Sequence, residues 1–162
     1  MPVWVRSQLW VAESKEAARY WVQAYGAQHA YGLAFYILRF KDDPDVQRLT
    51  KDLEAKYPGI LDEIWTIYKG WDVNQLERID APVGKLASNR LLDIFQFYGT
   101  VDDVCGQIQA LIDVGIRRFS FTIYVLEEHG DPEANLRSIA KEIMPRFNMA
   151  TRAKPVAAGS RA

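Results

Sequence analysis

The last third of the chain predicts a helix, a strand and a second helix in direct succession. Thr100 follows a glycine and can cap a helix expected over 100–113, which Gly115 then ends. The next residues alternate apolar and polar side chains, and this alternation predicts a strand over 117–126. A single strand between two helices cannot satisfy its own edges, so it must belong to a larger sheet.

The second helix of this run is expected over 132–146. Asp131 is placed to cap it and a proline occupies its first position. Only one other clear strand pattern occurs, at residues 3–12, where aliphatic residues such as Val5 and Leu9 alternate with Arg6 and Gln8 and the β-branched and aromatic content favours a strand. Helical crossovers return a chain in the same direction, so the two strands are predicted to be adjacent and parallel.

The residues between the two strands are predicted to form helices and a loop. Ser14 can cap a long helix that reaches Arg39, and an acidic residue followed by proline begins a shorter helix that stops at Pro58. Further short helices are expected over 60–71 and 72–79. A loop is expected over 81–84.

Composition excludes several classes of protein. A formal net charge of −1 on 162 residues gives no electrostatic footprint for nucleic acid or an anionic membrane. Cys105 is the single cysteine, which excludes an internal disulfide and favours a reducing cytoplasm. The longest apolar run, over 30–38, is shorter than the ~18 residues of a membrane span. We expect one soluble domain over 1–147 and a disordered tail over 148–162.

The stretches "GTVDDVCGQIQALIDVGIRRFSF" and "GDPEANLRSIAKEIMPRF" resemble the C-terminal end of the luciferase-like flavin monooxygenase and F420-dependent oxidoreductase superfamily. That family shows the same order of a Gly-Thr cap, a helix ending in glycine, a strand, and a closing helix ending in proline. The match runs from Gly99 to Phe147, and residues 3–25 resemble the preceding strand and helix more loosely. Residues 40–95 would then be the helical insertion that varies most in the family.

The resemblance implies an α/β fold that is the C-terminal part of a TIM (β/α)8 barrel, with two parallel strands as its seventh and eighth. Such barrels usually need ~250 residues, so the first six strands would be missing. In the family those strands carry most contacts to the cofactor, FMN or coenzyme F420. The resemblance therefore implies a partner: either a homo-oligomer or another chain that supplies the missing half of the barrel.

Barrel chemistry occurs at the carboxyl ends of the strands, which directs attention to Trp10 and to residues 124–129. Tyr124 and His129 are candidate substrate contacts, and Glu127, Glu128 and His129 could supply an acid, a base or one metal ligand. The alternative interpretation of these three residues is a solvated turn before the Asp131 cap. With two histidines far apart in sequence, no metal motif is predicted.

Two further groups of candidates come from the middle of the chain. In some family members basic residues of the insertion hold a substrate phosphate, and the resemblance gives that role to Lys85 and Arg90; solvated surface side chains are the alternative. Gly99 and Thr100 begin a helix whose amides could accept a cofactor anion, although capping alone explains Thr100. Cys105 is interpreted as a small buried residue.

Two functions from different classes remain open. The first is a C-terminal portion or subunit of a luciferase-like oxidoreductase or monooxygenase that contributes barrel closure and substrate-side elements, while the cofactor performs the chemistry. The second is a non-catalytic half-barrel that associates with itself through its open strand edges. No residue is assigned as the catalytic acid or base.

Overall fold

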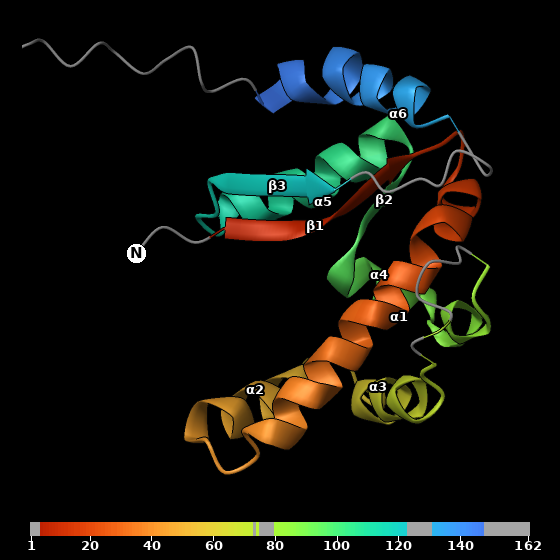
Figure 1. Ribbon diagram of the computed structural model, residues 1–162. Helices are drawn as coiled ribbons and strands as arrows, with labels where there is room; N and C mark the ends of the chain where they lie inside the picture. The colour runs from red at the N-terminus through yellow and green to blue at the C-terminus, as the bar shows by residue number, and fades with distance from the viewer. Residues whose placement is uncertain (1–3, 73, 75–79, 123–130, 148–162) are drawn as a thin grey trace, which may run out of the picture.

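The computed structural model describes residues 4–72, 74, 80–122 and 131–147. Within them the chain forms three strands and six α-helices, with short 3-10 and π segments (Figure 1). In chain order these are β1 Trp4–Val11, α1 Lys15–Arg39, α2 Pro44–Lys56, α3 Ile60–Lys69, the 3-10 segment η2 Pro82–Leu86, α4 Asn89–Phe95, β2 Phe97–Gly99, α5 Val101–Asp113, β3 Arg118–Thr122, and α6 Pro132–Ser138, which continues into the π segment η4 Ile139–Ile143 and the 3-10 segment η5 Met144–Phe147.

The three strands form one open parallel sheet in the order β2-β1-β3. β1 pairs with β3 from Trp4, opposite Arg118, to Gln8, and it pairs with β2 only at its end, from Leu9, opposite Phe97. The prediction of two adjacent parallel strands is confirmed over the described residues. The prediction that there are only two strands is wrong, because β2 is a third. The described sheet does not close into a barrel.

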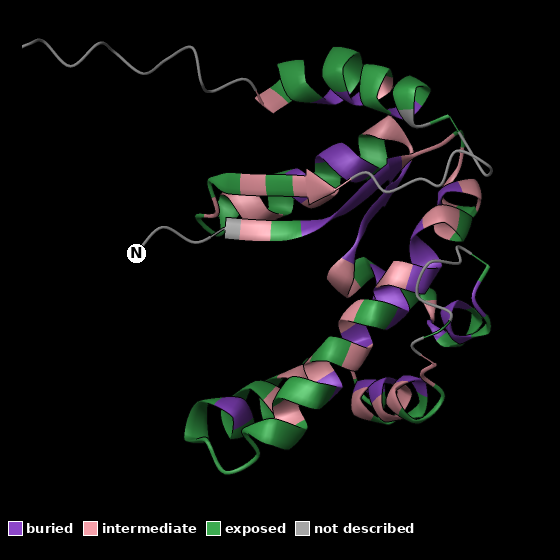
Figure 2. Cartoon of the chain, viewed as in Figure 1, coloured by how far each residue is buried: buried purple, intermediate pink, exposed green. Residues whose placement is uncertain are grey.

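Neighbouring residues of the sheet serve opposite faces, so helices cover the sheet on both sides. Trp10 and Tyr98 face α1, α3 and α4, whereas Leu9 and Phe97 face α5 and the segment after α6. The connection from β1 to β2 therefore runs over one face and the connection from β2 to β3 runs over the other. Buried residues accordingly line both sides of the sheet in Figure 2.

The far half of α1 extends away from the sheet (Figure 1). There α3 packs against α1, and α2 packs against α3. Alanines on α1 are fully buried and let α3 approach closely, while Ile60, Ile64 and Ile67 form the buried face of α3. Tyr31 of α1 stacks on Tyr68, with ring centroids 5.2 Å apart. These helices share one hydrophobic core with Trp10 and Tyr98 of the sheet.

Several local predictions are confirmed. Ser14, Thr100 and Asp131 each accept a backbone N–H as the N-caps of α1, α5 and α6. The loop expected over 81–84 is wrong, because Pro82–Leu86 forms a 3-10 segment with proline in its first turn. The helix expected over 72–79 and the tail over 148–162 lie outside the described residues, apart from Asp72 and Asn74. No helix among the described residues is long and apolar enough to cross a membrane.

Candidate functional site

In parallel α/β sheets, ligands bind at the carboxyl ends of the strands, so this edge is the candidate site. Here β1 and β2 end side by side, and the Ala12 N–H donates to the Gly99 carbonyl at 2.9 Å. The Asn135 amide of α6 donates to the Val11 carbonyl at 2.9 Å, which fixes α6 over the end of β1. The Asn135 side-chain oxygen is buried and has no hydrogen-bond partner among the described residues.

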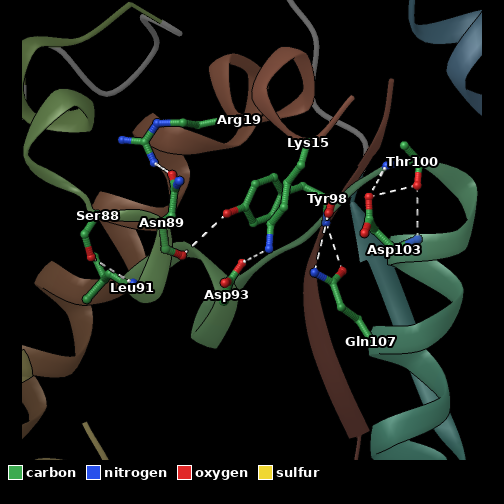
Figure 3. Close-up of polar contacts among 10 residues, drawn as sticks. All are labelled: Lys15, Arg19, Ser88, Asn89, Leu91, Asp93, Tyr98, Thr100, Asp103 and Gln107. Carbon is green, nitrogen blue, oxygen red and sulfur yellow. Dashed lines mark hydrogen bonds and ion pairs between the residues drawn. The ribbon is translucent and has the colours of Figure 1, made fainter. Parts of the chain in front are cut away.

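Tyr98 is the central side chain behind this edge (Figure 3). It is fully buried, its hydroxyl donates to the Asn89 carbonyl at 3.4 Å, and Lys15 Nζ lies 5.1 Å from its ring centroid. Lys15 also forms a 2.8 Å ion pair with Asp93. Burial raises the pKa of Tyr98, and Asp93 raises it further, so the hydroxyl stays protonated. A buried, neutral phenol of this kind stabilises the fold and cannot reach a substrate.

Gly99 and Thr100 lie where the sequence places them, at the start of α5. Gly99 has a φ of 131°, which a residue with a side chain rarely adopts. The Thr100 N–H and hydroxyl both donate to the Asp103 carboxylate, at 2.9 and 2.8 Å. A carboxylate therefore already lies at the helix N-terminus, where a cofactor phosphate would have to bind. The N-terminus of α5 therefore does not form a phosphate-binding site.

Lys85 lies on η2 and Arg90 lies on α4. Arg90 donates to the Pro58 carbonyl at 2.8 Å and lies 3.6 Å from the Glu63 carboxylate. Glu63 in turn accepts from the backbone N–H and hydroxyl of Ser88, the N-cap of α4. Arg90 thus joins α4 to the turn before α3, whereas Lys85 is exposed on η2.

The remaining candidates do not form one site. Trp10 is buried and stacks on Trp21, with ring centroids 4.7 Å apart, so it belongs to the core on the α1 face. Tyr124, Glu127, Glu128 and His129 lie outside the described residues. Cys105 is buried, as expected, and burial raises the pKa of its thiol, which makes it a poor nucleophile.

Sequence reasoning missed three buried polar groups: Asn135, Gln96, and the hydroxyl of Tyr98. Gln96 Nε2 lies 2.7 Å from His29 Nδ1, while its side-chain oxygen has no hydrogen-bond partner within the described part of the chain. Nothing local in the sequence marks these residues, because their burial depends on which elements meet in space. His29 is therefore a hydrogen-bonded histidine of α1.

The described residues hold no group of three or more His, Cys, Asp or Glu side chains that could bind a metal ion. Comparisons with protein-family models, curated proteins and solved structures find no match for this chain.

Proposed function

We propose that the chain is the C-terminal portion or a subunit of a luciferase-like flavin- or F420-dependent oxidoreductase. The observation that supports this most directly is the parallel pairing of β1 with β3 over five residue pairs, the arrangement expected of the last two strands of such a barrel. The Thr100 cap, the glycine at Gly115 with a φ of 98°, and the Asp131 cap follow in the order of the family.

In this proposal the chain supplies structure and the substrate side, and most contacts to FMN or F420 come from elsewhere. When bound, the cofactor would supply the hydride or oxygen chemistry. Asp103 lies at the start of α5 where a phosphate would bind, so we assign no cofactor contact to Gly99 or Thr100 and derive no catalytic step. Asn135 and the residues around Ala12 lie at the carboxyl edge of the sheet. In this proposal a substrate binds at that edge, and these residues keep water away from it.

The test is reconstitution with the missing part. The chain is purified alone and after co-expression with the polypeptide encoded immediately upstream of it. We expect flavin or deazaflavin absorbance in the co-purified complex and little in the chain alone. If the upstream polypeptide lacks the six strands, or the complex is colourless when supplied with FMN and with F420, the proposal is wrong.

A second function is favoured by a separate observation. β3 has no strand on its outer side, and β1 has none beside Trp4–Gln8 on its β2 side, among the residues that the structure describes. Open edges promote association, which fits a non-catalytic protein that binds copies of itself. A colourless and stable homodimer in sedimentation velocity would favour this function. A well-folded monomer at all concentrations would contradict both proposals, because each needs a partner at the sheet edges.

A further inference from the structure

The solvent-facing side of α1 carries no charge over most of its length. The sequence has no Asp, Glu, Lys or Arg between Arg19 and Arg39, and this stretch includes the half of α1 that extends away from the sheet (Figure 1). The inward side of the helix is lined by fully buried alanines, and α3, α4 and η2 pack against α1. Exposed helix surfaces are normally rich in charged residues, so the outward side needs a separate explanation.

The outward residues form a continuous stripe that contains both a notch and a large side chain. At helical spacing this stripe consists of Gln28, Gly32, Phe35, Tyr36 and Arg39, all of them exposed (Figure 2). Phe35 is 48% exposed and Tyr36 is 46% exposed. A Cβ placed on Gly32 would meet nothing within 4 Å, and Gly32 has no positive φ. The packing and backbone of this chain therefore do not require a glycine at a position where glycine weakens the helix.

The spacing of Gly32 and Phe35 makes the stripe complementary to itself. A glycine leaves a notch on the surface of a helix, and a large side chain of a facing helix can fill it. Two copies can cross antiparallel about a two-fold axis midway between these two residues, so that Phe35 of each copy lies against Gly32 of the other. The same axis brings Arg39 of each copy beside Gln28 of the other.

Charge selects this antiparallel arrangement of two copies. Arg39 is the charged residue of the stripe, and the amide oxygen of Gln28 on the second copy can accept a hydrogen bond from its guanidinium group. A parallel arrangement would place Arg39 against Arg39 and Phe35 against Phe35, with both notches left empty. A membrane surface is a poor occupant, because Arg39 and Lys41 are followed by two aspartates and give no basic excess.

We propose that this stripe is the contact of a homodimer in which the α1 helices of two copies cross antiparallel. The exposed parts of Phe35, Tyr36 and Phe40, at ~100 Å² each, together with Gln28 and Arg39, would bury roughly 1,000 Å² over both copies. That area is at the lower limit of specific interfaces, so the dimer is weak and depends on concentration. The contact leaves the strand edges free and rests on neither proposed function.

The experiment exchanges the notch and the large side chain. Sedimentation velocity measures the dissociation constant of the dimer for the wild type, for Gly32→Phe, for Phe35→Gly, and for the double variant that carries both changes. The double variant again has one glycine and one phenylalanine at the same spacing, so its stripe is again complementary to itself. The matched control is Gly106→Phe, at an exposed glycine of α5 where an added Cβ also meets nothing within 4 Å. Circular dichroism checks that each variant is folded.

We expect each single substitution on α1 to weaken the dimer about tenfold or more, the double variant to return to within about threefold of the wild type, and Gly106→Phe to leave the dimer unchanged. Gly32→Ala is a second test, because it should raise the melting temperature of the dilute monomer and still weaken the dimer.

The proposal is overturned if the wild type is a monomer at every concentration, or if the single variants dimerise as well as the wild type, which would place the contact elsewhere. It is also overturned if the double variant dimerises no better than the single ones. The reconstitution test of the proposed function reads cofactor absorbance, so its outcome is independent of these results.

Discussion

Thr100 and Asp103 satisfy each other's polar groups at the start of α5. Asp103 Oδ2 accepts the Thr100 N–H at 2.9 Å, and the Thr100 hydroxyl oxygen accepts the Asp103 N–H at 3.2 Å. The backbone hydrogen bond from Thr100, followed by the one from its hydroxyl, lowers the pKa of Asp103. The same reciprocal cap fixes the turn from β2 into α5, so it couples β2 to the helix that crosses the sheet.

The first prediction concerns acid. The pKa of Asp103 is lower in the folded chain than in the unfolded chain, so its carboxylate stabilises the fold above the unfolded value of about 4. That stabilisation is lost as the pH falls through the folded value. Asp103→Asn should therefore lower the melting temperature at pH 7 and make little difference at the lowest pH where the chain stays folded. A gap between the two proteins that is constant across pH would contradict this. Asp42→Asn, at an exposed position with no hydrogen bond among the described residues, is the control.

Replacing Gly99 or Gly106 by alanine should change the free energy of unfolding in opposite directions. A Cβ on Gly99 would lie 2.7 Å from the side chain of Asp103, and the φ of 131° disfavours any side chain. We expect Gly99→Ala to cost about 1–3 kcal/mol of unfolding free energy. A Cβ on Gly106, inside α5, meets nothing within 4 Å, and Gly106→Ala should gain about 0.5–1 kcal/mol. Urea unfolding measures both; a Gly99→Ala variant as stable as the wild type would show that the backbone at Gly99 is not constrained.

Helix caps could be predicted because their signals are local. Thr100 and Asp131 each accept the N–H of a residue three positions later, so the relevant residues are neighbours in sequence. The strand pattern at the N-terminus was also local, since alternation along one strand reports its two faces. Parallel pairing then followed from chain connectivity.

β2 could not be predicted in the same way. Its three residues, Phe97–Gly99, are all buried, so they show no alternation, and the segment is too short for any period. Its position beside β1 also follows from contacts distant in sequence, such as that between Ala12 and Gly99.

Alkali should destabilise the chain through Tyr98. Burial raises the pKa of Tyr98 in the folded chain, so above about pH 10 the unfolded chain loses this proton first. Stability should therefore fall as the pH rises from about 10. Tyr98→Phe should fall less steeply, after an initial loss of roughly 1 kcal/mol at neutral pH for the missing hydroxyl. Tyr20→Phe changes a tyrosine that is 42% exposed and should keep the wild-type slope. Equal slopes for wild type and Tyr98→Phe in urea unfolding at pH 9 to pH 11 would refute this.

Mild acid should act through His29. Its Nδ1 lies 2.7 Å from Gln96 Nε2, and burial lowers its pKa below the ordinary value. The unfolded chain therefore binds this proton first, and stability should decline as the pH falls below about 6.5, until the folded pKa is passed.

His29→Gln keeps a hydrogen-bonding side chain beside Gln96 but cannot titrate, so its melting temperature should change little between pH 7.5 and pH 5.5, where that of the wild type falls. The chain has two histidines, and His129→Gln, which removes the other one, should leave the wild-type decline in place. NMR titration of the His29 ring should give a pKa below 6.5. If His29→Gln declines as steeply as the wild type, burial of the His29 imidazole is not the cause of the decline in mild acid.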